Sequence, residues 1–121
     1  MNGETRPTKL GIIGAGGVGS ATAYAATLRG SASEIVLYDI DGKRAHAEAL
    51  DIAHGSMFAH EANIIGGSEL ETLKDADMII ITAGARQEPN QPRMELAGAN
   101  VRILEKLLPD LMSVAPGAIY M

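Results

Sequence analysis

A cluster of glycines directly after an apolar run constrains this chain more than any other feature of its sequence. The run Leu10–Ile13 is followed by Gly14-Ala15-Gly16-Gly17-Val18-Gly19. Glycine loses more backbone entropy on folding than any other residue, so a cluster this dense needs a structural reason. Three of the glycines have the spacing Gly-x-Gly-x-x-Gly, which is typical of a loop that joins a buried strand to a helix and holds a phosphate group.

Each glycine of this pattern is expected to have its own physical role. Gly14 makes the tight turn, Gly16 lets the backbone approach a pyrophosphate, and Gly19 lets the helix pack closely against the strand. Val18, within the same loop, is expected beside the cofactor. The spacing alone leaves open a flavin site and an S-adenosylmethionine site. A P-loop is the weaker alternative, because it needs Gly-Lys-Ser/Thr and no lysine follows the last glycine here.

An acidic residue follows the second apolar run at the distance that a dinucleotide-binding fingerprint requires. Residues 34–38 read Glu-Ile-Val-Leu-Tyr, and Asp39 comes directly after them. A carboxylate at this position accepts hydrogen bonds from ribose hydroxyl groups and repels a 2′-phosphate, which favours NAD over NADP as the cofactor. The alternative is that Asp39 only begins the turn with Asp41-Gly42.

Apolar runs and helical patterns alternate along the rest of the chain. The predicted strands are Lys9–Ile13, Glu34–Tyr38, Asn63–Ile65, Asp77–Thr82 and Ala118–Met121, and the predicted helices are Val18–Arg29, Lys43–Phe58 and Met94–Leu108, with a short crossover over Leu70–Ala76. Pro109 is expected to break or kink the last helix, which then resumes over Asp110–Val114. This alternation predicts an α/β Rossmann-type parallel sheet with helices on both faces. Because the chain stops within a strand, we expect residues 1–121 to be a dinucleotide-binding domain truncated after about five strands, without a substrate domain.

Composition argues against several other classes of function. Of the 121 residues, 46% are hydrophobic and 21% are charged, so one globular domain is expected. A net charge of −5 argues against a nucleic-acid partner, and no apolar run approaches the about 18 residues of a membrane helix. The chain has no cysteine, which excludes thiolate metal sites and suits a reducing compartment. Since the N-terminal residues also lack a secretory signal, the sequence predicts a cytoplasmic protein with no metal site and no membrane contact.

Three later stretches, taken together with the glycine loop and Asp39, carry a resemblance to a known family. They read Leu50-Asp51-Ile52-Ala53-His54-Gly55, Thr82-Ala83-Gly84-Ala85-Arg86-Gln87, and Arg93-Met94-Glu95-Leu96 with Asn100-Val101. In this order the motifs resemble the lactate/malate dehydrogenase family, and within it the L-lactate dehydrogenases. The resemblance runs from about Leu10 to Met121, and its ordered set of motifs is far more specific than any one of them.

The resemblance implies hydride transfer between NAD(H) and lactate or pyruvate in the full-length enzyme. Further cofactor contacts would come from Arg44 near the adenosine and from Thr82, Ala83, Gly84 and Ala85 at the end of the fourth strand. Arg93 would bind the substrate and polarise its ketone as the catalytic residue, because a guanidinium is always charged. Gln87 would face the substrate side chain. Malate enzymes place an arginine there for the second carboxylate, so a neutral glutamine favours lactate.

The loop before Arg93 departs from the family pattern. The family loop reads Pro-Gly-x-Ser/Thr-Arg, whereas this chain reads Pro89-Asn90-Gln91-Pro92-Arg93. Asparagine is among the residues that best tolerate a left-handed backbone, so Asn90 is expected to replace the glycine there. Pro92 fixes its own φ and restricts the residue before it, so closure of the loop is expected to be altered.

The resemblance also implies residues that this chain does not contain. The family's acid/base histidine, its paired aspartate and a further arginine would lie beyond Met121, and none of His46, His54 and His60 matches the catalytic position. The chain alone is therefore expected to be inactive, and the full-length protein is expected to form a homodimer or homotetramer. Malate or another 2-hydroxy acid as the substrate, and a non-catalytic NAD-binding module, stay open as alternatives.

Overall fold

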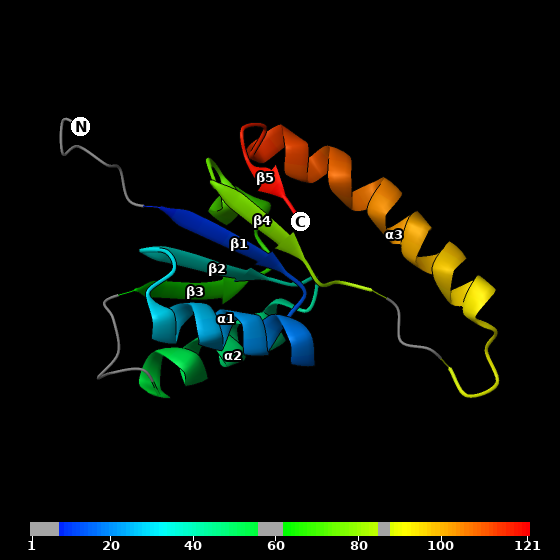
Figure 1. Cartoon of the computed structure of the whole chain (residues 1–121), viewed down its shortest axis with the longest axis horizontal. Coiled ribbons are helices and arrows are strands. Elements are labelled where there is room, and N and C mark those ends of the chain that lie inside the picture. The colour runs from blue at the N-terminus through cyan, green and yellow to red at the C-terminus, as the bar shows by residue number, and fades with distance from the viewer. Residues whose placement is uncertain (1–7, 56–61, 85–87) are drawn as a thin grey trace.

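All the strands of this chain form one parallel sheet in the part of the chain that the structure describes. The structure is a computed structural model that describes residues 8–55, 62–84 and 88–121. Its strands are β1 (Lys9–Ile13), β2 (Glu34–Tyr38), β3 (Asn63–Gly67), β4 (Met78–Ile81) and β5 (Ile119–Tyr120). The five-stranded sheet has the order β3-β2-β1-β4-β5, with every neighbouring pair parallel (Figure 1). Strands β2 and β3 are thus added on one side of β1, and β4 and β5 are added on its other side.

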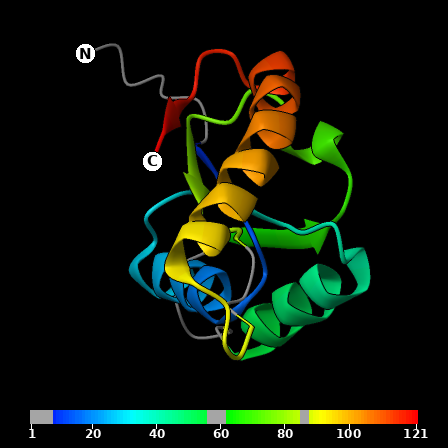
Figure 2. The same cartoon turned by 90° about the vertical axis from the view of Figure 1, so that its right-hand side faces the viewer.

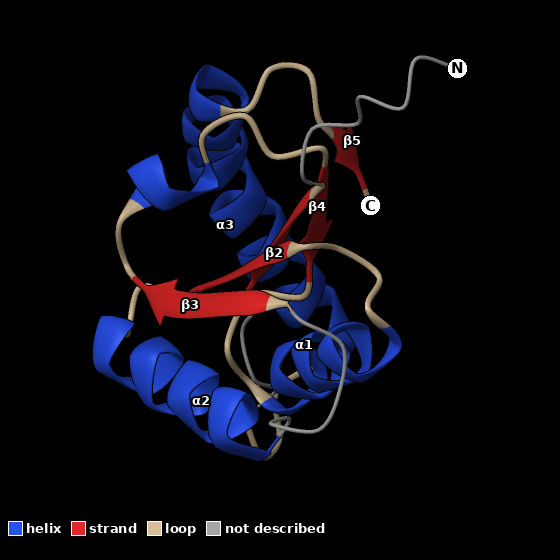
Figure 3. Cartoon of the chain, turned by 90° about the vertical axis from the view of Figure 1, so that its left-hand side faces the viewer, coloured by secondary structure: helices blue, strands red, loops and turns tan. Residues whose placement is uncertain are grey.

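Helices cover both faces of this sheet, as the sequence predicts. They are α1 (Gly17–Arg29), α2 (Gly42–Gly55), the short 3₁₀ helix η1 (Leu70–Leu73) and α3 (Arg93–Val114). Figure 3 shows α1 and α2 together on one side of the sheet and α3 on the other. In Figure 2, α3 lies in front of the strands along much of its length. The Rossmann-type architecture predicted from the alternation of strands and helices is therefore confirmed.

The two faces of the sheet carry two separate apolar cores. Successive side chains of a strand point to opposite faces, so Ile12 and Ile13 enter different cores. The core under α1 and α2 is built on small helix residues and larger strand residues, among them Ala23, Ala26, Ala45, Ala49, Ile35 and Leu37. The core under α3 contains Val36, Leu73, Ile79, Leu111 and Ala115. A strand buried on both faces needs apolar side chains throughout, which explains the continuous apolar runs in the sequence.

Helix α3 differs from the sequence prediction, because it runs through Pro109 as one helix of 22 residues. The predicted break at this proline is wrong. A proline inside a helix removes one backbone N–H and frees the carbonyl group four residues earlier, here that of Glu105. Both Glu105 and Pro109 are exposed, so water can bind that carbonyl oxygen. Leu107 and the fully buried Leu111 pack into the core on either side of the proline and hold the helix together.

The remaining boundaries follow the sequence closely. Strands β1 and β2 begin and end at the predicted residues, and β3 extends to Gly67 because it pairs with β2 as far as Tyr38. The predicted helix over Lys43–Phe58 is described as far as Gly55. Among the described residues, no helix combines the length and the apolar character needed to cross a membrane.

Candidate functional site

The glycine loop and Asp39 lie side by side at the carboxyl edge of the sheet. The loop leaves β1 after Ile13, and Asp39 directly follows the neighbouring strand β2. Two hydrogen bonds join them: the Gly14 N–H donates to the carbonyl oxygen of Tyr38 at 2.7 Å, and the Ala15 N–H donates to Asp39 Oδ2 at 2.7 Å. Open α/β sheets bind ligands at this edge, at the point where the strand order reverses. Here that point lies between β1 and β4.

Two glycines of the loop are required by the local geometry. Gly14 has a φ of 108°, a backbone conformation that L side chains rarely adopt. A Cβ atom on Gly19 would lie 1.7 Å from the carbonyl oxygen of Gly14, so α1 can begin this close to the loop only with glycine there. By contrast, a Cβ atom on Gly16 would meet nothing within 4 Å. Gly16 therefore borders open space, and its contact with a pyrophosphate stays a prediction.

The N-terminus of α1 opens onto the same space. Gly16 is the N-cap residue and makes no side-chain cap bond, and the first turn of α1 has no acidic residue. The first backbone N–H groups of a helix have no partner within the helix, and the helix dipole adds partial positive charge at this end. This end of α1 therefore has the character of an anion-binding site.

Asp39 holds the loop and the following turn at the same time. Its Oδ2 accepts the Ala15 N–H, and its Oδ1 accepts the Asp41 N–H at 2.9 Å. The turn role considered from the sequence is therefore present, together with a bond to the glycine loop. An ionised carboxylate has about four acceptor positions, so two further hydrogen bonds to ribose hydroxyl groups are possible. That ribose contact stays a prediction.

Thr82 joins the end of β4 to the start of the glycine loop. Its backbone N–H donates to the carbonyl oxygen of Ile13 at 2.8 Å. Its hydroxyl Oγ1 lies 3.0 Å from the same oxygen and 3.2 Å from the carbonyl oxygen of Gly14. Ala83 and Gly84 continue from Thr82 along the rim of the cleft.

A cleft of about 580 Å³ lies above these residues. It brings together most of the predicted cofactor-binding residues: Gly14, Gly16, Val18, Gly19, Asp39, Arg44, Thr82, Ala83 and Gly84. Ala85, the remaining predicted cofactor contact, lies outside the described residues. The cleft thus collects residues from the glycine loop, the end of β2, the start of α2 and the end of β4.

One wall of the cleft is formed by residues that the sequence motifs do not predict. It consists of Ile103, Lys106, Leu107 and Asp110 on α3 and of Ile40 after β2. The four helix residues have the spacing i, i+3, i+4 and i+7, which places them on one face of a helix. That spacing is a signal in the sequence, but only the packing of α3 shows which of its faces meets the cleft.

Tyr38 also lines the cleft, and its surroundings disfavour ionisation of its phenol. Burial raises the pKa of Tyr38 above its ordinary value of 10.0, and the nearby carboxylates of Asp110, Asp39 and Glu69 raise it further. A neutral phenol can donate as well as accept a hydrogen bond. Tyr38 thus belongs both to the core under α3 and to the lining of the cleft.

Of the two predicted substrate residues, only Arg93 is described, and it does not line this cleft. Arg93 is the first residue of α3, is exposed, and is not among the residues that line the cleft. Figure 1 shows this end of α3 projecting away from the sheet. Gln87 lies outside the described residues. The roles of Arg93 and Gln87 toward a substrate therefore stay predictions.

The segment before Arg93 forms a closed turn. Asn90 has a φ of 70°, so asparagine takes the left-handed conformation expected where the family has glycine. The Gln91 N–H donates to the carbonyl oxygen of Glu88 at 3.0 Å, and the Glu88 N–H donates to Gln91 Oε1 at 2.9 Å. Pro92 follows as the N-cap residue of α3. The sequence Glu-Pro-Asn-Gln therefore folds as a turn closed by two hydrogen bonds.

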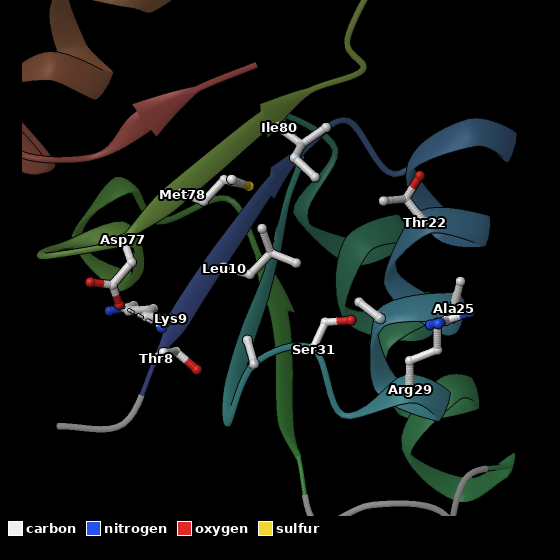
Figure 4. A pocket seen from close by; sticks show the side chains of 12 residues that line it. Thr8, Lys9, Leu10, Thr22, Ala25, Arg29, Ser31, Asp77, Met78 and Ile80 are labelled. Carbon is white, nitrogen blue, oxygen red and sulfur yellow. Dashed lines mark hydrogen bonds between the residues drawn. The ribbon is translucent and has the colours of Figure 1, made fainter. Parts of the chain in front are cut away.

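A second hollow lies between α1 and the strands β1 and β4, at the other end of the sheet (Figure 4). It has a volume of about 540 Å³ and is lined mainly by apolar groups such as Leu10, Met78 and Ile80. Thr8 and Asp77 at its rim stand at the amino ends of their strands. Ligands of parallel α/β sheets bind at the carboxyl ends, so the cleft at the glycine loop is the candidate site. Within the described ranges, no cluster of His, Cys, Asp and Glu is suited to hold a metal ion.

Comparison with known proteins gives a family match over nearly the whole chain. A family model described as lactate/malate dehydrogenase, NAD binding domain, matches residues 8–121. The L-lactate dehydrogenase of Bifidobacterium animalis subsp. lactis is 51% identical over 121 residues, which are 100% of this chain and 38% of that protein. The sequence match is therefore to the first part of a longer enzyme.

Solved structures agree with this match. The lactate dehydrogenase of Cryptosporidium parvum, solved with lactic acid and nicotinamide adenine dinucleotide, superposes with a TM-score of 0.88 at 30% identity, over 97% of this chain and 37% of that one. The malate dehydrogenase of Archaeoglobus fulgidus, solved with NADH, gives a TM-score of 0.86 at 34% identity, over 93% of this chain and 39% of that one. The chain therefore spans less than two fifths of the length of these relatives.

Proposed function

The chain belongs to the lactate/malate dehydrogenase family as an NAD-binding domain, and we propose that the cleft at the carboxyl edge of its sheet is the NAD site. One observation carries the proposal: the N-terminus of α1 and the carboxylate of Asp39 border one cleft, and the 2.7 Å bond from the Ala15 N–H to Asp39 Oδ2 joins the carboxylate to the glycine loop that leads into α1. The helix N-terminus suits a pyrophosphate, and the carboxylate suits the adenosine ribose.

The other walls of the cleft fit the remaining parts of the dinucleotide. Ile40, Ile103 and Leu107 provide apolar surface for the adenine ring. Gly16 leaves room for the backbone to approach the pyrophosphate, and Ala83 and Gly84 line the cleft with small residues after β4. Small residues at these positions suit a flat ligand that lies against the backbone.

We further propose that the full-length protein is an L-lactate dehydrogenase. NAD(H) supplies the hydride chemistry when it is bound. In that protein Arg93 polarises the carbonyl group of a small 2-keto acid, and closure of its loop excludes water from the reacting atoms. Gln87 leaves room for a methyl group and offers no cation to a second carboxylate, which favours pyruvate over oxaloacetate. The 51% identity to an L-lactate dehydrogenase supports this choice.

Two parts of the proposal concern the protein in the cell. We propose a cytoplasmic location, and a homodimer or homotetramer as the assembly of the full-length protein. The molar mass of that protein by light scattering tests the assembly directly, because a monomer at micromolar concentration contradicts it.

The cofactor proposal is tested by binding of NADH and NADPH to this chain. Calorimetric titration should give tighter binding of NADH, because the Asp39 carboxylate repels a 2′-phosphate. Asp39→Asn removes the charge and keeps an oxygen for the Ala15 N–H, but it loses the bond from the Asp41 N–H. That loss affects both ligands alike, so the ratio isolates the charge, and the preference for NADH should fall by about tenfold. Glu71→Gln removes one negative charge from η1, outside the cleft, and should leave the preference unchanged. Equal loss of both ligands in Asp39→Asn contradicts the ribose role.

The substrate proposal is tested in the full-length enzyme. Gln87→Arg should shift the ratio of kcat/KM from pyruvate toward oxaloacetate by at least about a hundredfold, since a buried pair of arginine and carboxylate contributes several kcal/mol. An unchanged ratio contradicts the role of Gln87. A chain that binds NADH but shows no reduction of either acid at full length favours the non-catalytic alternative.

A further inference from the structure

We propose that the hydroxyl group of Thr82 is a positioning group for the pyrophosphate loop, and that it acts by holding the carbonyl oxygens of Ile13 and Gly14, where the loop leaves β1, rather than by contacting the cofactor. The inference rests on the proposed NAD site and specifies how that site keeps its shape. It differs from the direct contact with the cofactor that the resemblance implies for Thr82.

The hydroxyl group stands where three pieces of the fold meet. Thr82 follows the last residue of β4, and its Oγ1 lies 3.0 Å from the carbonyl oxygen of Ile13, the last residue of β1. The same Oγ1 lies 3.2 Å from the carbonyl oxygen of Gly14, the first residue of the loop. It would also lie 2.8 Å from a Cβ atom on Gly19, in the first turn of α1. The single proton of this hydroxyl group is shared between the carbonyl oxygens of Ile13 and Gly14 as a three-centre hydrogen bond, so one group contacts both the strand end and the loop.

The loop has a second anchor on its opposite side. Asp39 Oδ2 accepts the Ala15 N–H at 2.7 Å, while Thr82 binds the carbonyl group of the preceding residue, Gly14. These two groups belong to the same peptide unit, Gly14–Ala15. Its carbonyl oxygen is held from β4 and its N–H is held from β2, so the orientation of the peptide plane is fixed at both ends.

A fixed peptide plane matters for binding an anion. The carbonyl oxygen of Gly14 carries partial negative charge, and it now points toward Thr82 and Gly19. If this oxygen turned toward the cleft, it would oppose a pyrophosphate, whereas the N–H groups at the start of α1 attract one. Gly14 has a φ of 108°, and glycine can adopt many other backbone conformations, so the turn depends on its partners.

The proposal predicts which ligands lose affinity when the hydroxyl group is removed. Thr82→Val keeps the shape of the side chain without the hydroxyl group, and should weaken binding of both ADP and NAD to this chain by about tenfold, the upper range for one hydrogen bond. Adenosine has no phosphate group, so its affinity should change less than about twofold. Thr82→Ser keeps the hydroxyl group and should restore the binding of ADP and NAD.

A control uses a second threonine whose hydroxyl group also donates to a backbone carbonyl group. Thr27 is fully buried in α1 and its Oγ1 donates to the carbonyl oxygen of Ala23 at 2.8 Å, outside the cleft. Thr27→Val removes a hydroxyl group that binds a backbone carbonyl away from the cleft, and should leave all three affinities unchanged. If Thr82→Val does not fold, Thr82→Ala adds no atoms and allows the same comparison, with folding followed by circular dichroism.

Each other outcome of these titrations overturns the inference. A larger loss for NAD than for ADP means that Thr82 contacts the nicotinamide half directly. An equal loss for adenosine means that the whole cleft is damaged, and no loss for any ligand means that the hydroxyl group is not needed. Failure of the unmodified chain to bind NAD would instead refute the proposed function, so the two failures are distinguishable.

Discussion

Replacing Gly19 with alanine should destabilise the fold, because the added methyl group has no room. Its Cβ atom would lie 1.7 Å from the carbonyl oxygen of Gly14 and 2.8 Å from Thr82 Oγ1. To restore an ordinary van der Waals contact of 3.4 Å, the first turn of α1 would have to move by about 1.7 Å. The nearest atom belongs to the backbone, so no side-chain rotation can relieve the contact.

The size of the effect follows from what this movement disturbs. Helix α1 packs through Ala23 and Ala26, which are 0% and 7% exposed, so a shift opens space in the core beneath it. Overpacking by a methyl group costs about 1–3 kcal/mol, and more where the backbone must move. We therefore expect Gly19→Ala to lower the free energy of unfolding by about 3 kcal/mol.

A neighbouring glycine provides the control for this substitution. Gly17 is in the same loop and begins α1, but a Cβ atom there would meet nothing within 4 Å. Alanine at a helical position is more stable than glycine by about 0.5–1 kcal/mol, so Gly17→Ala should stabilise the fold slightly.

Urea denaturation followed by far-ultraviolet circular dichroism measures both variants. With a slope of about 1–3 kcal/mol per molar urea, a loss of about 3 kcal/mol lowers the midpoint by at least about 1 M. A Gly19→Ala variant within about 0.5 kcal/mol of the unmodified chain would refute the argument from close approach. An equal change in the free energy of unfolding of Gly19→Ala and Gly17→Ala would also refute it.

Three further predictions concern the cleft and the loop. Gly16→Val should leave the urea midpoint nearly unchanged but weaken NADH binding by at least about tenfold in a calorimetric titration, because its side chain enters open space beside the helix N-terminus. Burial raises the pKa of Tyr38 above 10.0 in the folded chain, so ionisation of this phenol favours the unfolded chain. The contribution of the neutral phenol to the free energy of unfolding is therefore complete below pH 10 and is lost as the pH rises through the folded-state pKa. Denaturation between pH 9 and pH 12 should therefore show a smaller loss of stability in Tyr38→Phe than in the unmodified chain, and equal losses exclude this role of Tyr38. Asn90 has a φ of 70°, so Asn90→Ala should destabilise the turn by about 1 kcal/mol while Asn90→Gly should not. Amide hydrogen exchange at Gln91 measures this difference, and identical exchange in both variants contradicts it.

The sequence predicts best those elements whose local pattern and packing agree. Residues 9–13 and 34–38 are apolar runs between turn residues, and they form β1 and β2 with the predicted bounds. The small residues of α1 predict close packing on the sheet, and Ala23 is fully buried there. In these elements the local preference of the chain and its tertiary environment favour the same structure.

The predicted break at Pro109 does not occur, because a distant contact outweighs a local preference, while the helix predicted over Asp110–Val114 is present. A proline favours the end of a helix, but Leu111 is fully buried against the sheet and Leu107 packs on the same core. Burial of a leucine side chain contributes about 1.5–3 kcal/mol, comparable with the cost of an interior proline of about 3 kcal/mol. The sequence around residue 109 does not contain the position of the sheet, so it could not reveal this balance.

The candidate site is predictable in part for the same reason. The glycine spacing and Asp39 follow from a motif within one strand-helix-strand unit, so sequence reasoning finds them. The wall formed by Ile103 and Leu107 depends on how a helix that begins more than fifty residues later crosses the sheet. The hydrogen bonds from Thr82 to the loop depend in turn on the pairing of β1 with β4. Only the structure reveals these contacts, because each joins segments that are distant in the sequence.

The location of bound NADH tests the central claim most directly. In a titration of the isotope-labelled chain followed by nuclear magnetic resonance, the backbone amide signals of Gly16, Asp39, Ala83 and Leu107 should shift together with one dissociation constant, since all four residues line one cleft. Residues of the second hollow, such as Ala25, should not shift. No shift on addition of NADH, or shifts confined to the second hollow, would contradict the assignment of the glycine-loop cleft as the NAD site.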